Sequence, residues 1–122
     1  MKSLKAFLLF SLVLSTAALA FSQECSSVSK LDGAKYTRTF SGYTYTFTIR
    51  GCHVVMRGSA GVTCVSDPIQ EWRFEMSECT HEHGFISPDS AYIVLVDPRC
   101  SVTDTTWNCP EGTAGSTKYP RE

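Results

Sequence analysis

The sequence contains no cluster of lysine and arginine residues. Behind the first twenty residues its arginines are scattered, and each stretch of chain carries at most one of Arg38, Arg50, Arg57, Arg73 and Arg99. The whole chain has 11 lysines and arginines against 12 aspartates and glutamates, which gives a formal net charge of -1. Proteins that bind a phosphate backbone need clustered cations that displace its counterions. We therefore expect no nucleic acid partner.

Motifs for metal binding and glycosylation are also missing. No two cysteines have the C-x2-C spacing that is typical of zinc sites. The single asparagine, Asn108, is followed by Cys109-Pro110 and so lies outside any N-glycosylation sequon. The sequence also shows no internal repeat and no linker between domains. We expect one domain that holds no metal and no cofactor.

Residues 1–20 have the three parts of a secretory signal peptide. Lys2 and Lys5 give a positive start, residues 6–13 are almost entirely apolar, and Ala18-Leu19-Ala20 is a small-x-small cleavage site. Polar residues interrupt the run before it reaches the roughly 20 apolar residues that a membrane span needs. We expect cleavage after Ala20 and a secreted, extracellular mature chain without a membrane anchor.

Alternating aromatic and β-branched residues dominate the remaining sequence, whereas apolar residues at helical spacing are absent. In Tyr43–Arg50 the aromatic residues and the isoleucine face one side of a strand, and the threonines and the arginine face the other. Residues 36–40 have a similar composition, and Ser41-Gly42 between the two segments predicts a tight hairpin turn or a bulge. Residues 91–96 are almost continuously apolar, which is typical of a strand buried on both faces.

Shorter strands are predicted between these segments, and the connections between them are rich in glycine and polar residues. The predicted strands cover residues 52–57, 62–65 and 71–76, and the predicted connections cover residues 58–61 and 81–84.

About seven short strands in roughly 100 residues are typical of an all-β fold, here a small disulfide-stabilised antiparallel β-sandwich or β-barrel. We expect a single β-domain over residues 21–110. Residues 111–122 are rich in glycine, threonine and proline and have few apolar side chains. We therefore expect them to form a flexible, disordered tail.

Six cysteines follow the leader: Cys25, Cys52, Cys64, Cys79, Cys100 and Cys109. An even number in a short exported chain predicts a disulfide framework rather than metal or redox chemistry. Sequence alone does not choose among the possible pairings. Proximity along the chain ranks Cys25–Cys52, Cys64–Cys79 and Cys100–Cys109 first. A nucleophilic thiol, the alternative, would leave an odd cysteine or a free pair.

The most reactive string in the sequence is His81-Glu82-His83. On a strand, His81 and His83 would share one face and could weakly bind a divalent metal. Two ligands do not make a metal site, so we interpret the string as part of a polar loop.

One enzymatic hypothesis is a secreted ribonuclease or other hydrolase. A carboxylate and an imidazole would exchange protons at the 2′-hydroxyl while an arginine stabilises the phosphorane, and the candidate residues are His53, Glu71, Arg73, Glu75 and His81. The three of these in residues 71–75 alternate on one strand face, which is equally typical of any solvent-facing strand. We expect no catalytic residue in the chain.

A carbohydrate-binding module is a further hypothesis. Sugar rings stack on exposed aromatic platforms, and Tyr36, Tyr43, Tyr45 and Trp107 could form one. A row of tyrosines on an alternating strand is also typical of the side that faces the core.

The cysteine spacing, together with a few neighbouring residues, resembles a known family. Gly61-Val62-Thr63-Cys64 is followed by Glu71-Trp72 and Cys79, and an apolar strand then precedes Cys100 and Trp107-Asn108-Cys109. This pattern, over roughly residues 25–112, resembles the fungal secreted β-barrel proteins of the Alternaria major-allergen type. In that family a disulfide loop of intermediate length is followed by a short C-terminal one.

The resemblance implies a compact β-barrel or sandwich without a catalytic centre. It also implies a protein secreted by a filamentous fungus that acts on host tissue as an effector, elicitor or allergen. The chain departs from the family in being shorter and in offering Cys25 and Cys52 as an extra bridge. We therefore expect a monomer rather than a dimer joined through an N-terminal cysteine.

Together these features predict a secreted, cysteine-rich effector or elicitor that acts in virulence and is not an enzyme. Because rigid sheets leave recognition to their connecting loops, we expect a host protein or cell-wall component to bind there. The predicted binding residues are the loop at 58–61 and the loop formed by Thr80, His81, Glu82, His83 and Gly84. A hydrolase and a carbohydrate-binding module remain alternatives, as does a protease inhibitor that presents Arg99.

Overall fold

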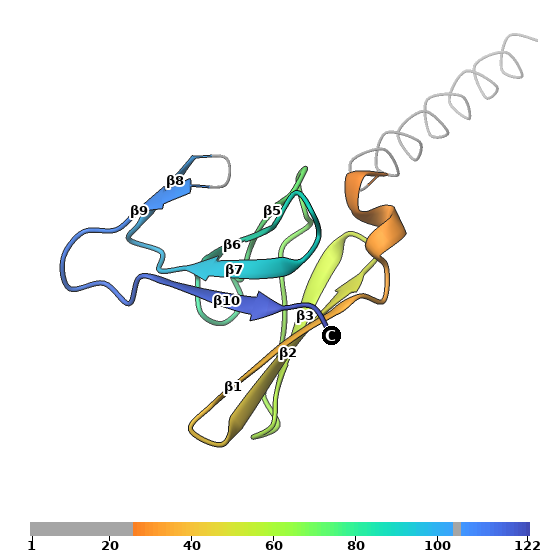
Figure 1. Cartoon of the computed structure of the whole chain (residues 1–122), viewed down its shortest axis with the longest axis horizontal. Helices are drawn as coiled ribbons and strands as arrows, with labels where there is room; N and C mark the ends of the chain where they lie inside the picture. The colour runs from red at the N-terminus through yellow and green to blue at the C-terminus, as the bar shows by residue number, and fades with distance from the viewer. Residues whose placement is uncertain (1–25, 104–105) are drawn as a thin grey trace, which may run out of the picture.

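The structure is a computed structural model that describes residues 26–103 and 106–122. It confirms an all-β, antiparallel fold stabilised by disulfides, with two four-stranded sheets and one two-stranded hairpin (Figure 1). The predicted leader and Cys25 lie outside the described residues. No helix in the described part of the chain is long and apolar enough to cross a membrane.

Sheet A has the strand order β1-β2-β3-β4. Its strands are β1 (Lys35–Phe40), β2 (Tyr43–Arg50), β3 (His53–Gly58) and β4 (Thr63–Val65). β2 has the bounds that alternation predicted, and its inward residues Phe47 and Ile49 are fully buried. The turn before it is also confirmed, because Ser41 and Gly42 both have positive φ, at 46° and 86°. Positive φ at both central residues is what a tight hairpin turn between twisted strands requires.

Sheet B has the strand order β10-β7-β6-β5. Its strands are β5 (Arg73–Glu75), β6 (His83–Ile86), β7 (Tyr92–Val96) and β10 (Ser116–Pro120). The strand predicted at residues 91–96 is confirmed as β7, a central strand of this sheet. Its last four residues are buried from both sides, as its continuous apolar run indicates.

The prediction of a disordered tail at residues 111–122 was wrong. β10 pairs antiparallel with β7 over five residues. Tyr119 points inward, is only 7% exposed, and its ring lies 4.6 Å from that of Phe47 between centroids. The segment is polar by composition, but it satisfies backbone groups along β7 that would otherwise lack partners. This long-range pairing leaves little trace in the local sequence.

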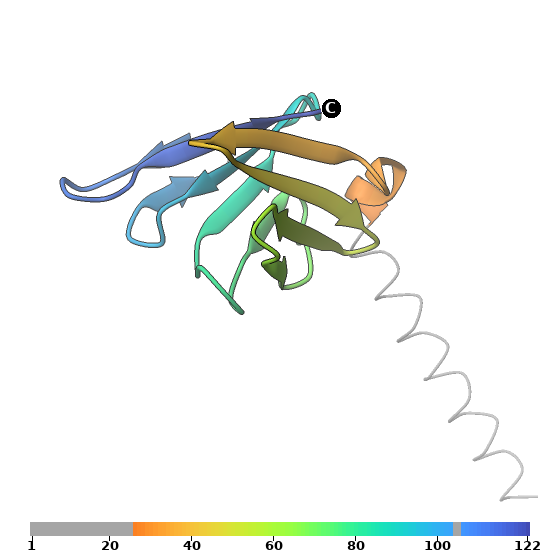
Figure 2. The same cartoon turned by 90° about the horizontal axis from the view of Figure 1, so that it is seen from below.

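The two sheets pack face to face, and both seams between them are bridged. At one seam β1 runs beside β10, where Tyr36 and Arg121 form an antiparallel bridge and Glu122 N–H donates to Lys35 C=O at 2.9 Å (Figure 2). At the other, Asp67 N–H after β4 donates to Glu75 C=O of β5 at 2.9 Å. The result is a sandwich with curved, almost continuous walls.

A short 3-10 helix, η1 (Ser26–Leu31), covers one end of the space between the sheets. Its residues Val28 and Leu31 are 0% and 6% exposed and belong to the main core. The sequence did not predict this helix, because two apolar residues three positions apart are too weak a signal for a helical turn.

A hairpin covers part of the outer face of sheet B. It consists of β8 (Ser101–Thr103) and β9 (Thr106–Asn108), and it projects from the rest of the molecule in Figure 1. Trp107 packs on Phe85 with ring centroids 5.9 Å apart, above the buried Val94 and Val96. Sheet B therefore has apolar layers on both faces, which is why β7 reads as continuously apolar.

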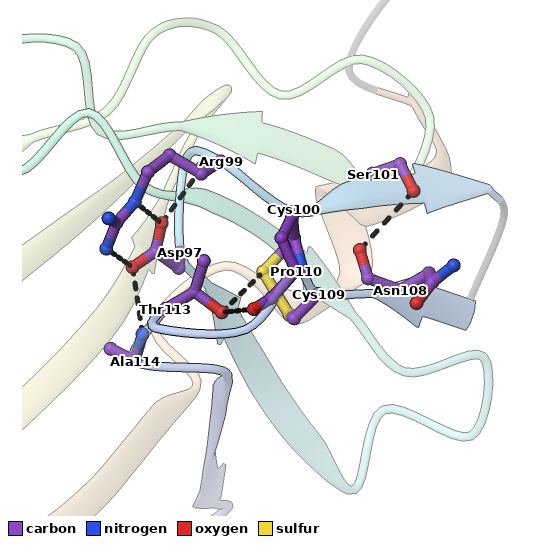
Figure 3. Close-up of a disulfide and its surroundings, with 9 residues drawn as sticks. All are labelled: Asp97, Arg99, Cys100, Ser101, Asn108, Cys109, Pro110, Thr113 and Ala114. Atoms are coloured by element: carbon purple, nitrogen blue, oxygen red, sulfur yellow. Dashed lines mark hydrogen bonds and ion pairs between the residues drawn. A yellow bond between two sulfur atoms is a disulfide. The ribbon is translucent and has the colours of Figure 1, made fainter.

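Two of the predicted disulfides are confirmed, Cys64–Cys79 and Cys100–Cys109. Cys52 is also disulfide-bonded, but its predicted partner Cys25 lies outside the described residues. The Cys100–Cys109 bridge closes the base of the hairpin formed by β8 and β9 (Figure 3).

Candidate functional site

Two turns meet at one end of sheet A. The turn between β1 and β2 is joined to the connection between β3 and β4 by reciprocal hydrogen bonds. Ser59 N–H donates to Thr44 C=O at 2.9 Å, and Thr44 N–H donates to Ser59 Oγ at 3.0 Å. We call residues 41–44 and 58–62 the hairpin end; both turns lie at the bottom of Figure 1. The predicted loop at residues 58–61 is thus part of a braced unit.

The hairpin end carries large apolar side chains that face solvent. Tyr43 is 54% exposed and Val62 is 51% exposed. In the described residues the only other large hydrophobic side chain with comparable exposure is Val65, at 37%. Isolated exposed apolar residues are common on protein surfaces, but two on one braced end offer a defined apolar contact surface.

The prediction of a polar loop at residues 81–84 was wrong for its second half. His83 and Gly84 are the first two residues of β6, opposite Glu75 and Phe74 of β5. The earlier part is a tight turn, in which the N–H groups of Cys79 and His81 both donate to Met76 C=O. Only Thr80, His81 and Glu82 of the five predicted binding residues therefore belong to a connection.

Glu82 in this turn lies between solvent and the core. Burial raises the pKa of its carboxyl, while a hydrogen bond with Thr80 acts in the opposite direction. Burial, together with the nearby charge of Glu82, also raises the pKa of Tyr119 to about 12. The charge of Glu82 therefore acts on Tyr119 of β10.

The Cys64–Cys79 disulfide connects the two predicted binding loops. Cys64 follows Val62 by two residues, and Cys79 directly precedes Thr80; the Cα atoms of the two cysteines are 6.2 Å apart. This bridge holds the turn at residues 79–82 close to the hairpin end. The structure therefore places close together two segments that the sequence predicted as two separate binding loops.

A groove lies between sheet B and the β8–β9 hairpin. Its volume is about 540 Å³. Glu75 and His83 line it from adjacent strands, with Glu75 Oε1 3.1 Å from His83 Nδ1. Arg73 and Glu71 also line it, with Arg73 Nη2 3.8 Å from Glu71 Oε2, and Val102 stands on the hairpin side. We call this the His83 groove.

The His83 groove gathers only part of the residue set proposed for a ribonuclease. Neither His53 nor His81 lines it. His53 Nδ1 lies 2.9 Å from Ser66 C=O on sheet A, and His81 occupies the tight turn with a φ of 57°. The histidine that reaches a carboxylate is instead His83.

The charge of the groove also disfavours a phosphodiester. Its lining includes Asp67, Glu71 and Glu75, and among the described residues Arg73 is the only arginine that lines it. Like charges repel most strongly at short range. No group of three or more histidine, cysteine or acidic residues in the described ranges could hold a metal ion.

The proposed aromatic platform does not form. Tyr36 is fully buried and its hydroxyl donates to Ser90 C=O at 2.8 Å. Tyr45 packs against Phe40, and Trp107 covers Phe85, so only Tyr43 of the four is largely exposed. The alternation that suggested a row of tyrosines instead reflects the core-facing side of sheet A.

The proposed protease-inhibitor loop at Arg99 is held by its own neighbour. The Arg99 guanidinium donates from Nε and Nη2 to the Asp97 carboxylate, both at 3.0 Å (Figure 3). These hydrogen bonds raise the pKa of Arg99. The Arg99 side chain is 64% exposed, but a protease pocket would have to displace both of these hydrogen bonds to bind it.

No family model matches the chain, and no curated protein or solved structure matches it at a significant level.

Proposed function

We propose that the protein is a secreted, non-enzymatic effector or elicitor, produced by a fungus, that binds a host protein or cell-wall component. In this proposal it acts outside the cell as a monomer. The observation that carries it is the position of Tyr43 and Val62, both more than half exposed, on the hairpin end. The export signal expected at residues 1–20 and the disulfide framework support an extracellular role.

When a partner covers exposed tyrosine and valine side chains, their apolar surface is removed from water, and this contributes to the free energy of binding. Tyrosine is among the residues that dominate interface energetics, because its large ring gains contact area with little loss of conformational freedom. The reciprocal hydrogen bonds between Ser59 and Thr44 hold the two turns in place before binding. Such preorganisation lowers the entropy lost on association.

The turn at residues 79–82 extends this surface. The Cys64–Cys79 bridge fixes its distance from the hairpin end. Thr80 and His81 are exposed and offer polar contacts beside the apolar ones. An apolar centre with a polar rim is the usual arrangement of a protein interface.

The alternatives lack comparable support. The His83 groove has an oriented imidazole but surrounds it with carboxylates, and the tyrosines proposed for a sugar platform lie mostly in the core. We therefore assign no catalytic residue and place recognition at the hairpin end.

The test is capture of partners from host extracellular fluid by the immobilised, oxidised mature protein. The Tyr43→Ser/Val62→Ser double variant should lose the partner, with recovery at least about tenfold lower, the loss typical of central interface residues. Val65→Ser is the matched control, because Val65 is an exposed valine on β4 outside the hairpin end. It should recover the partner like the wild type. Equal recovery by the double variant would show that recognition lies elsewhere.

A further inference from the structure

A second cavity lies at the seam where β1 runs beside β10. It has a volume of about 370 Å³ and is lined by Arg38, Ala91, Tyr92, Lys118 and Pro120. Pro120 of β10 is the cross-strand partner of Tyr92 of β7. Arg38 reaches across from β1, and its Nη1 donates to Lys118 C=O at 3.2 Å. We call this cavity the seam pocket.

Neither cation at the seam pocket forms a salt bridge with a carboxylate of the described residues. Within residues 26–103 and 106–122, the salt bridges are formed by Arg73, His83 and Arg99, and neither Arg38 nor Lys118 takes part in one. The nearest acid along the chain from Ala91, Asp89, already accepts hydrogen bonds from Ser87 and from Ala91 N–H. None of the described residues that line the pocket is acidic.

Aromatic rings hold the two cations in place. The Arg38 guanidinium carbon lies 4.7 Å from the centroid of the Phe40 ring, and Lys118 Nζ lies 4.7 Å from that of Tyr92. A cation over a ring keeps its N–H donors, and an arginine has five of them. One Arg38 donor meets the Lys118 carbonyl, so the others remain for a ligand.

The groups around the pocket complement an anion that carries an apolar body. An arginine fork binds a carboxylate bidentately, and a lysine adds a point charge beside it. Tyr92 and Pro120 add a ring face and an apolar wall next to these charges. A free inorganic anion or an acidic side chain would use the charges alone, whereas a sugar ring with an attached carboxylate would use both.

We propose that the seam pocket binds uronic acid units of an acidic polysaccharide. The carboxylate pairs with Arg38 and Lys118, and the sugar ring packs on Tyr92 and Pro120. The pocket shares no residue with the hairpin end, so the inference stands or falls separately from the proposed recognition of a partner there.

The experiment is isothermal titration calorimetry of the oxidised mature protein with tetragalacturonate. We expect binding that weakens as salt rises to about 0.15 M, since exposed charges are screened over roughly 8 Å at that concentration. The neutral tetrasaccharide cellotetraose should give no heat. Lys118→Gln should weaken binding about tenfold, the effect of one charge-assisted contact. Lys30→Gln removes an equal charge from the exposed face of η1 and should bind like the wild type.

A second variant separates the sugar from its charge. Tyr92→Leu removes the ring that packs on the sugar and orients Lys118 but keeps both charges, so it should weaken tetragalacturonate binding more than it weakens the binding of inorganic sulfate. Absence of binding by the folded wild type, or equal affinities of Lys118→Gln and Lys30→Gln, would overturn the proposal. Binding of hexaglutamate or sulfate as tightly as tetragalacturonate would overturn its assignment to a sugar.

Discussion

The ring of Phe74 fills the space beside Gly84, the residue directly opposite it in the β5–β6 pair. A Cβ atom at Gly84 would overlap this ring, so the position has room for no side chain. Glycine in a strand interior commonly marks such a close approach. Gly84, which the sequence nominated for binding, is therefore a packing residue.

Substitution of Gly84 by alanine should destabilise the protein by about 1 to 3 kcal/mol, because the Phe74 ring must leave its place in the core. Urea unfolding followed by tryptophan fluorescence measures the loss. Gly112→Ala is the comparison, since it meets no atom within 4 Å but has a φ of +82°. Its cost should be about 1 kcal/mol from backbone strain alone. A Gly84→Ala protein as stable as the wild type would contradict this packing.

Asp97 joins two loops that follow β7 and precede β10. Its carboxylate accepts hydrogen bonds from the backbone and side chain of Arg99 and, at 3.0 Å, from Ala114 N–H (Figure 3). These hydrogen bonds, that of the Arg99 side chain foremost, hold the pKa of Asp97 well below its usual range. The ionised carboxylate therefore stabilises the folded state.

The sign of the pH effect follows from that lowered pKa. The contribution is complete above the ordinary aspartate pKa of about 4 and is lost as the pH falls towards the lower folded value. Asp97→Asn should lower the melting temperature near pH 6 and should lose less stability than the wild type between about pH 4 and pH 2. Melting curves of Glu78→Gln, which alters an exposed acid, should follow the wild type at each pH. Parallel pH profiles for Asp97→Asn and the wild type would disprove the role.

Removal of the Cys64–Cys79 bridge should cost about 2 to 4 kcal/mol, because the bridge restricts the unfolded chain. It should also release the turn at residues 79–82 from β4. Limited proteolysis of Cys64→Ser/Cys79→Ser should cut near this turn first. The matched Cys100→Ser/Cys109→Ser variant should be cut at the β8–β9 hairpin instead. Identical cleavage patterns in the two variants would argue against separate roles for the bridges.

Trp107 shields the outer face of sheet B. Trp107→Ala should expose the Phe85 ring and the neighbouring valines, with a loss of about 2 kcal/mol for a half-buried aromatic side chain. The variant should bind a hydrophobic dye that the wild type does not bind. Trp72→Ala tests the opposite case, because Trp72 packs against the main core between the sheets. It should lower stability without creating this dye site.

Local pattern predicted the strands whose burial alternates over several residues. Tyr43–Arg50 is the clearest case, because Phe47 and Ile49 are buried where alternation places them inward and Arg50 is exposed, whereas Tyr43 at the start of the strand faces solvent. The continuous apolar run of β7 likewise predicted a strand that is buried on both faces. Proximity along the chain also ranked the Cys64–Cys79 and Cys100–Cys109 pairs first, since both close short loops between adjacent elements.

The segments that were missed depend on distant parts of the chain. β10 is polar, and it is a strand because β7 offers it backbone partners and because Tyr119 fits beside Phe47. β6 begins with His83 and Gly84, two residues that are typical of a loop in the local sequence. The strand has a glycine at this position because the Phe74 ring leaves no space for a side chain. The hairpin end likewise needs the hydrogen bonds between Ser59 and Thr44, which no sequence pattern reveals.

The central claim is that the hairpin end contacts the target. The most direct test places a photoreactive phenylalanine analogue at Tyr43, irradiates the protein in host extracellular fluid, and identifies the cross-linked proteins or wall fragments. The same analogue at Val65 and at Val102 gives matched probes on β4 and on the β8–β9 hairpin. We predict one dominant cross-linked product from position 43 that is absent from the other two positions. Cross-links of the same product from Val102 alone would place recognition at the His83 groove and contradict the proposal.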